Sequence, residues 1–419
     1  MAELLVTGMG AAGDGIAPGP TYVVGALPGE RVDATLLGRR GDGRAARLDS
    51  ILEPSPDRVA PPCPHFTEGC GGCAVQHWAP PAVAAWKRAR VAEALERAGF
   101  PSPPVAATMT VPPQSRRRAD LALRRQPDGT VTPGFHRRGS PEVLAIPQCR
   151  ILDPRLLALL APIAEALRGL SALRREGSAV VNLLDTGPDL LLRTDGPLDA
   201  PGRAALAHFA AAQDLPRIAW AQRDGAPETA AQLRPATIRL SGVEVAPPPG
   251  AFLQAAPEGE AAIVAAVLAG LPERLPMRAR LADLHAGLGT LTFPLATRSR
   301  VAAFEGDAAA VLALSAAAGR AGLPISSTRR DLTRQPLLPG ELAAFAAVVL
   351  DPPFAGAPEQ VAQIARGRVP RVIYVSCNPA ALARDGRALA AAGYRLLAAT
   401  PVDQFLWSAQ VEAVAVFAR

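Results

Sequence analysis

The feature that most constrains the fold is a regular alternation of apolar strands and alanine-rich helices in the last third of the chain. The segments that carry it are RLADLHAGLGTLTFPLA, RVAAFEGDAAAVLALSAAA, AFAAVVLDPPFAG and RVIYVSCNPAALARDGRALAAAG. Strands that are apolar throughout must be covered on both faces, and this pattern is typical of a mainly parallel, doubly wound sheet. We therefore predict a Rossmann-like α/β domain over residues 250–419, which the prolines at 247–249 separate from the preceding region.

The rest of the chain predicts two further domains, because 419 residues are too many for one hydrophobic core. Residues 1–55 place short apolar runs between glycine-rich turns, which indicates a small β-barrel. Residues 56–249 begin with a proline-rich connector, continue with a helical pattern at 82–100 and then mix helix and strand patterns. The predicted fold class is thus multidomain, with an N-terminal β-barrel, a central α+β domain and a C-terminal α/β domain.

The sequence contains no run of about eighteen apolar residues, and the start MAELLVTGMG lacks a basic region followed by an apolar core. We therefore expect a cytoplasmic protein with no membrane segment. In that compartment, cysteines more often bind metals or do chemistry than form disulfides. The net charge of +6, carried almost wholly by arginine, favours polyanionic partners.

Three predicted strand ends point to a nucleoside cofactor. The first strand ends at Asp283 and is followed by Gly287 and Gly289, the second ends in Glu305, and Asp331 follows the third. Ligands bind at the carboxyl ends of such strands, where glycines allow close approach and a carboxylate can accept hydrogen bonds from ribose hydroxyls. A third glycine and a Walker lysine are missing, so S-adenosylmethionine (SAM) fits better than NAD or ATP.

Cys377 follows the apolar strand VIYVS and precedes Asn378-Pro379 and a predicted helix. A thiol at a helix N-terminus is expected to have a lowered pKa, and a thiolate is a strong nucleophile. A buried structural cysteine is the alternative.

Four motifs occur together in an order that resembles the RNA uracil-5 methyltransferase family. They are GAFLQAAP (250–257), DPPFAG (351–356), YVSCNPAALARD (374–385) and QVEAVAVF (410–417). The motifs GCGGCAVQH and IPQC are similar to those of the branch that modifies ribosomal RNA and carries a [4Fe–4S] cluster. The N-terminal strands resemble the TRAM domain of that branch, an oligonucleotide-binding barrel.

The resemblance implies SAM-dependent methylation of uracil C5 in RNA, with 23S ribosomal RNA as the favoured target, through addition of a cysteine to C6. It places the nucleophile at Cys377 and the base at Glu412. It also implies that Phe252 contacts the target base and that the cofactor is held by Gln254, His285, Glu305 and Asp351. The chain departs from the family pattern at His285 (usually aromatic), Ala256 (usually Asn), Phe354 (usually Arg) and Gln410 (usually His).

Cys63, Cys70 and Cys73 lie close together in the sequence, and Cys149 lies far away. Four thiolates suit either tetrahedral zinc or an iron–sulfur cluster. The spacing of three close cysteines and one remote cysteine, together with the resemblance, favours a [4Fe–4S] cluster as a structural or RNA-shaping element.

RNA is the expected partner, and no protein partner is implied. SRRRADLALRR (115–125) and HRR (136–138) together hold seven arginines that we expect to neutralise phosphates. Three alternatives stay open: a transfer RNA target, an amino-methyltransferase that uses DPPF, and a non-catalytic RNA-binding factor in ribosome assembly.

Overall fold

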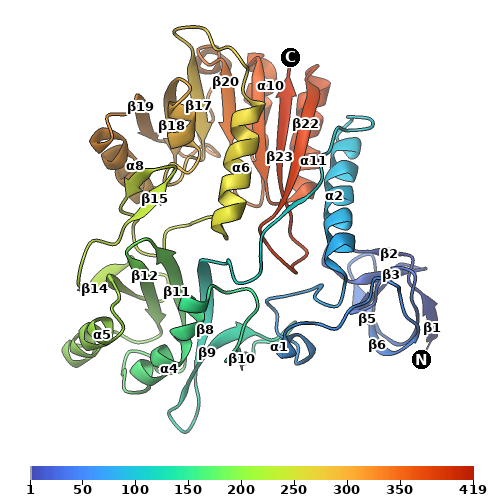
Figure 1. Cartoon of the computed structure of the whole chain (residues 1–419), viewed down its shortest axis with the longest axis vertical. Coiled ribbons are helices and arrows are strands. Elements are labelled where there is room, and N and C mark those ends of the chain that lie inside the picture. Colours follow the sequence, from blue (N-terminus) through green and yellow to red (C-terminus); the bar gives the residue numbers. More distant parts are fainter. Residues whose placement is uncertain (1) are drawn as a thin grey trace.

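The C-terminal part of the chain forms an eight-stranded sheet in the computed structural model, which describes residues 2–419 (Figure 1). In sheet order its strands are β19 (Ile325–Arg329), β18 (Arg300–Glu305), β17 (Arg280–Leu284), β20 (Ala347–Leu350), β21 (Arg371–Ser376), β23 (Glu412–Ala418), β22 (Arg395–Asp403) and β7 (Met109–Thr110). The five strands from β19 to β21 are parallel, whereas β23 runs antiparallel to both of its neighbours.

The order of these strands fixes where a ligand can bind. From β17 the chain moves outward to β18 and β19, and it then returns to β20 and β21 on the other side of β17. Such a reversal leaves a crevice at the carboxyl ends of the two central strands, which here are β17 and β20.

Helices cover both faces of this sheet. They are α6 (Pro257–Gly270), α7 (Thr292–Ala296), α8 (Ala308–Arg320), α9 (Pro339–Leu342), α10 (Pro358–Gly367) and α11 (Pro379–Ala391). Ile263 and Val267 of α6 belong to the core on one face, whereas Leu382 and Leu389 of α11 belong to the core on the other. The doubly wound arrangement expected from the sequence is therefore present.

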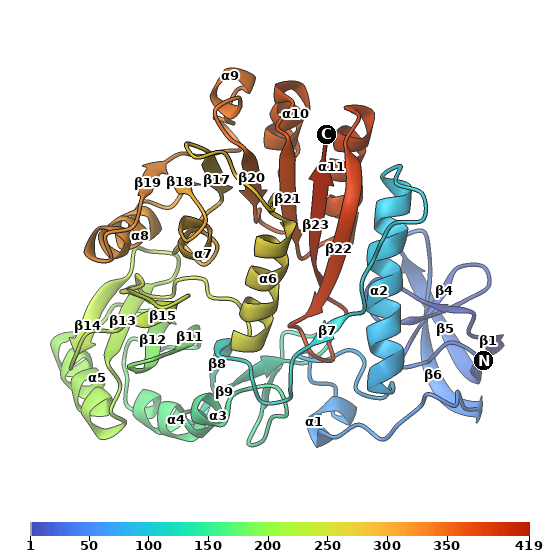
Figure 2. The same cartoon turned by 45° about the horizontal axis from the view of Figure 1, so that its top comes forward.

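Helix α2 (Pro80–Arg97) was expected in the central region, but it packs against the C-terminal sheet. Its residues Val91 and Leu95 share a buried core with Leu389 of α11. In both views α2 stands between the C-terminal strands and the N-terminal strands (Figures 1 and 2). The helix therefore joins two parts of the molecule that are far apart in the sequence.

The N-terminal residues form a six-stranded sheet in the order β1 (Ala2–Leu5), β5 (Arg31–Arg40), β6 (Gly43–Glu53), β4 (Thr21–Val24), β3 (Gly15–Ala17) and β2 (Gly8–Met9). The two end strands, β1 and β2, are successive parts of one segment. Between them, Thr7 N donates a hydrogen bond to Ile16 O (2.7 Å) and Val6 N donates one to Glu30 O (2.9 Å). The segment thus pairs on both sides and closes the sheet into a small barrel.

The central residues form a seven-stranded sheet with helices packed on it. In sheet order the strands are β10 (Val143–Ala145), β9 (Val131–His136), β8 (Arg118–Arg125), β11 (Glu176–Leu184), β12 (Gly187–Thr194), β13 (Arg217–Gln222) and β14 (Glu228–Gln232). The remaining elements are α1 (Pro64–Thr67), α3 (Pro154–Ala158), α4 (Leu160–Arg168), α5 (Ala200–Ala212) and the hairpin of β15 (Ile238–Leu240) and β16 (Val243–Val245).

Across residues 2–419, no helix is both long enough and apolar enough to cross a membrane.

Candidate active site

A pocket of about 540 Å³ lies at the carboxyl ends of β17, β18, β20 and β21. All but one of the predicted catalytic, cofactor and substrate residues line it, namely Phe252, Gln254, His285, Gly287, Glu305, Asp351, Cys377 and Glu412. The parallel strands bring His285, Gly287, Glu305, Asp351 and Cys377 together because their carboxyl ends meet at the same edge of the sheet. Glu412 begins the antiparallel strand β23, and Phe252 and Gln254 lie in the segment before α6.

The Glu305 carboxylate is held by backbone groups at the end of β18. Gly287 N donates a hydrogen bond to one of its oxygens and Asp307 N donates to the other, both at 2.8 Å. Gly287 has a φ of +54°, a conformation that glycine adopts without steric cost. The glycine turn after β17 and the carboxylate after β18 therefore form one rigid unit beside the pocket.

His285 follows β17 directly and has an unusual environment. Its backbone φ is +61°, and its Nε2 is buried without a hydrogen-bond partner within the described chain. Burial lowers the pKa of His285 below its ordinary value, so the ring is neutral. An unpaired buried nitrogen is costly unless a ligand satisfies it.

Asp283, at the end of the same strand, also lines the pocket. Thr292 Oγ1 donates to its Oδ2 at 2.5 Å, while Oδ1 is buried and has no partner among residues 2–419. Burial raises the pKa of Asp283 to about 7. Asp283 and His285 therefore offer unsatisfied polar atoms in the crevice, which fits a polar ligand such as SAM.

Asp331 is the one predicted cofactor residue that does not line the pocket. It is exposed, and its Oδ1 accepts hydrogen bonds from Thr333 N (3.1 Å) and Arg334 N (3.2 Å) in its own turn. The carboxylate thus serves local turn structure in this conformation.

Cys377 lies between β21 and α11, as the sequence predicts. Asn378 caps the helix, since its Oδ1 accepts a hydrogen bond from Ala380 N at 3.0 Å. The expected lowering of the thiol pKa is wrong. Burial raises the pKa of Cys377 to about 12, and the negative charges of Glu412 and Asp351 raise it further. In the free protein the thiol is therefore protonated.

Gln404 connects the acidic groups of the pocket and was not predicted. This buried side chain donates hydrogen bonds from Nε2 to Gln254 Oε1 (2.8 Å) and to Glu412 Oε2 (3.0 Å). Its Oε1 accepts from Ala255 N at 3.0 Å, which fixes the orientation of the amide. No motif marked Gln404, because its role depends on the position of the loop that follows β22.

The carboxyl groups of Glu412 and Asp351 both have raised pKa values. Burial raises the pKa of Glu412 to about 8, the charge of Asp351 adds to this, and the hydrogen bond from Gln404 opposes it. Burial also raises the pKa of Asp351 to about 6, against a hydrogen bond from Gln254 Nε2 at 3.3 Å. A carboxyl group with a pKa near neutrality is well suited to accept a proton at physiological pH.

The predicted [4Fe–4S] cluster is wrong for this structure. Among residues 2–419, no group of three or more His, Cys, Asp or Glu side chains is placed to hold a metal ion, so the zinc alternative fails as well. Cys63, Cys70 and Cys73 are buried, and Cys70 packs in the core of the central sheet with the partly buried Cys149 against it. Burial raises the pKa of Cys73 to about 12, so this thiol is neutral. These cysteines pack as small apolar side chains.

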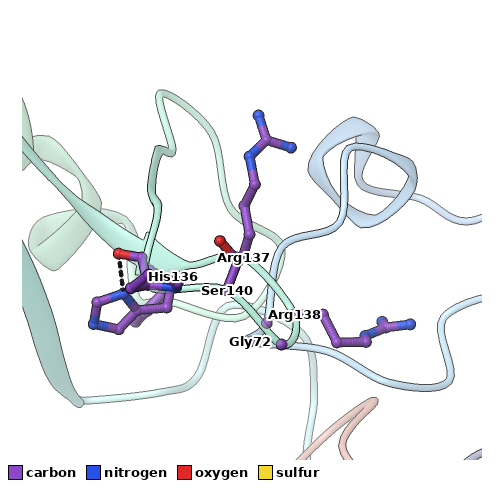
Figure 3. Close-up of a pocket in the computed structure, with 9 residues that line it drawn as sticks. Gly72, His136, Arg137, Arg138 and Ser140 are labelled. Atoms are coloured by element: carbon purple, nitrogen blue, oxygen red, sulfur yellow. Dashed lines mark hydrogen bonds between the residues drawn. The ribbon is translucent and has the colours of Figure 1, made fainter. Parts of the chain in front are cut away.

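A second cavity, of about 650 Å³, lies at the turn between β9 and β10 (Figure 3). Arg137 and Arg138 point in different directions from this turn. Arg137 pairs with Glu142 at 3.0 Å, and Arg138 Nη2 donates to Cys73 O at 2.8 Å. The turn is thus fastened to the cysteine segment.

The arginines of 115–125 also form ion pairs and hydrogen bonds within the protein. Arg117 is buried and pairs with Glu260 of α6, Arg124 pairs with Glu176, and Arg125 donates to backbone carbonyls around α4. Of the seven arginines expected to bind phosphates, only Arg138 is exposed. Most of this set stabilises the fold.

The chain is similar to known RNA methyltransferases. Residues 327–419 match the family model described as tRNA (Uracil-5-)-methyltransferase. The chain is 41% identical to an "Uncharacterized RNA methyltransferase" of Caulobacter vibrioides, over 100% of both chains. It is 37% identical to the 23S rRNA (uracil(1939)-C(5))-methyltransferase RlmD of Alkalilimnicola ehrlichii, over 100% of this chain and 96% of the relative.

The fold is similar to that of a solved structure. The Pyrococcus abyssi tRNA (uracil-54, C5)-methyltransferase, in complex with S-adenosyl-L-homocysteine, superposes with a TM-score of 0.76 over 99% of both chains at 20% identity.

Proposed function

This chain belongs to the RNA uracil-5 methyltransferase family, and we propose that it methylates C5 of a uracil in 23S ribosomal RNA with SAM as the methyl donor. The observation that carries the proposal is the meeting of Cys377 and Glu412 in the pocket that also holds the three strand ends with Asp283, Glu305 and Asp351. The chemistry at C5 needs both a nucleophile and a separate base.

In the proposed reaction Cys377 is the nucleophile and Glu412 is the base. The Cys377 thiol gives up its proton to solvent, the resulting thiolate adds to C6 of the uracil, and the electron pair of the C5–C6 double bond moves into an enolate. C5 then attacks the methyl group of SAM, whose sulfur leaves as a neutral thioether. The Glu412 carboxylate removes the proton from C5, and the returning electron pair expels the thiolate and restores the double bond.

The electrostatics of the pocket explain when the thiol can ionise. Burial first, and then the negative charges of Glu412 and Asp351, raise the pKa of Cys377 in the free protein. The positive sulfonium of bound SAM offsets these charges, since an opposite charge nearby favours the ionised form. Bound SAM would therefore oppose the charge part of the shift and lower the pKa of the Cys377 thiol relative to the free protein.

The other residues of the pocket bind the cofactor and the target base. Glu305 binds the ribose hydroxyls, while His285, Gln254 and Asp351 contact the rest of the cofactor. Phe252 stacks on the target uracil, which must leave its helix for C5 and C6 to be reached. Its exposed ring lies 5.8 Å from the Arg118 guanidinium, which orients it at the mouth of the pocket.

Ribosomal RNA is favoured over transfer RNA by the similarity to a relative named as a 23S rRNA methyltransferase, which is matched over 96% of its own length at 37% identity. The transfer RNA enzyme of Pyrococcus abyssi shares only 20% identity. An amino-methyltransferase that uses Asp351-Pro352-Pro353-Phe354 would need no cysteine, so the presence of Cys377 in the same pocket argues against it.

The test is to incubate the protein and SAM with unmodified 23S ribosomal RNA and, separately, unmodified transfer RNA. We expect mass spectrometry to find 5-methyluridine at one position of the 23S RNA. Methylation of transfer RNA alone would mean that the substrate is transfer RNA and not 23S ribosomal RNA. A methylated adenine or cytosine amino group would refute methylation at uracil C5.

A further inference from the structure

Two aromatic side chains stand apart from all the others in this molecule. Of the eleven Phe, four Trp and three Tyr residues, only Phe252 and Phe354 are exposed, at 67% and 58%. Both line the same pocket. Exposed apolar groups that gather at one cavity mark a binding surface.

The loop that carries Phe354 is held firmly in place. Asn378 Nδ2 donates to Phe354 O at 2.9 Å, and Arg384 Nη2 donates to Ala355 O at 2.7 Å. Ala357 N donates to the buried Asp385 carboxylate at 2.8 Å. The backbone that carries the ring is therefore held in place, so a ligand that stacks on the ring does not have to order the loop.

The position of the ring indicates what it contacts. The proposed function assigns the target base to Phe252, so Phe354, the second exposed ring that lines the pocket, is free to contact another base. When a nucleotide is extruded from an RNA helix, its neighbours lose a stacking partner. An aromatic ring is a suitable replacement, since every nucleobase has a π-face.

We propose that Phe354 is a stacking site for a nucleobase of the substrate RNA that neighbours the target uridine. The proposal rests on the proposed function and adds a second base-binding position to it. It assigns a role to an exposed side chain of the pocket that the proposed reaction does not use.

The test uses a hairpin fragment of 23S ribosomal RNA that contains the uridine found by the mapping experiment, with 2-aminopurine at one neighbouring position at a time. Affinity is measured by fluorescence anisotropy and stacking by quenching of 2-aminopurine. We expect Phe354→Ala to weaken binding by about 5- to 150-fold and to abolish quenching at one position. Phe354→Trp should restore both, whereas Phe354→Leu should restore neither.

Leu312→Ala is the matched control, because Leu312 is 71% exposed on α8 and does not line the pocket. It should leave affinity and quenching unchanged. Titration of each variant with SAM checks that the fold is intact.

Equal affinity and quenching in the parent protein and Phe354→Ala would overturn the stacking site, and so would full restoration by leucine. If the parent protein neither methylates nor binds the RNA, the proposed function itself is wrong. This outcome is observed with the parent protein alone and is therefore distinct from failure of the stacking site.

Discussion

Glu412 combines burial with a carboxyl group, and this makes the stability of the protein depend on pH. Its pKa is about 8 in the fold and near 4.5 in an unfolded chain. A raised pKa means that the fold favours the protonated form of Glu412. The contribution of this group to the free energy of unfolding is therefore complete below pH 4.5 and is lost as pH rises through about 8.

Glu412→Gln mimics the protonated form at every pH. We expect the parent protein and this variant to melt alike at pH 5, and the variant to be more stable by on the order of 2–4 kcal/mol at pH 9. Thermal melts of the RNA-free protein at several pH values measure this. Parallel curves for the two proteins would show that Glu412 is already ionised in the fold.

Gln404 positions both Glu412 and Gln254 through its two amide hydrogen bonds. We expect Gln404→Leu to lower kcat about tenfold or more. A buried hydrogen-bonding group that is left without its partner costs about 1–3 kcal/mol. The substitution should also raise the pKa of Glu412, since the hydrogen bond that lowers it is gone. Rates of methyl transfer and their pH dependence measure both effects.

The matched control is Gln360→Leu, which removes a buried glutamine that bonds only to Leu337. This change should lower stability and leave kcat unchanged. An equal loss of kcat in both variants would mean that Gln404 acts through the fold alone.

At the scale of elements, α2 is tied to the end of β22 by the only lysine of the chain. Lys87 and Asp403 form a buried ion pair at 2.5 Å, with side chains 0% and 2% exposed. Lys87→Met should destabilise the protein by about 3–5 kcal/mol, because Asp403 is left buried and unpaired. The midpoint of urea unfolding measures the loss.

The double variant Lys87→Met with Asp403→Leu should recover most of that stability, since no uncompensated charge remains. If the single variant unfolds at the parent midpoint, the pair contributes nothing to holding α2.

Local patterns predicted the elements well but not all of their partners. The apolar strands and the glycine turn after Asp283 were predictable, and the parallel order then required Glu305, Asp351 and Cys377 to meet at one edge. The packing of α2 on α11 and the loop position of Gln404 depend on contacts between distant residues, which no local pattern reports. The cysteine spacing was misleading, because the same residues pack as buried thiols.

At the scale of the whole molecule, every residue that lines the pocket comes from position 248 onward. The central sheet supports this site from outside. Arg117 Nε donates to Gln254 O at 3.0 Å, and Asn182 Nδ2 donates to Ala251 O at 2.8 Å. The segment that carries Phe252 is therefore held by the central sheet, while the residues that line the pocket come from the C-terminal part of the chain.

In the proposed mechanism, Cys377 attacks the uracil and Glu412 completes the reaction. Substrate RNA with 5-fluorouridine at the target position tests it most directly, because fluorine cannot leave as a proton. With SAM present, the parent protein should form a covalent complex with this RNA that persists on a denaturing gel. Glu412→Gln should form the same complex with unmodified RNA, and Cys377→Ala should form none and make no product. A complex or methylated product that survives Cys377→Ala would contradict the mechanism.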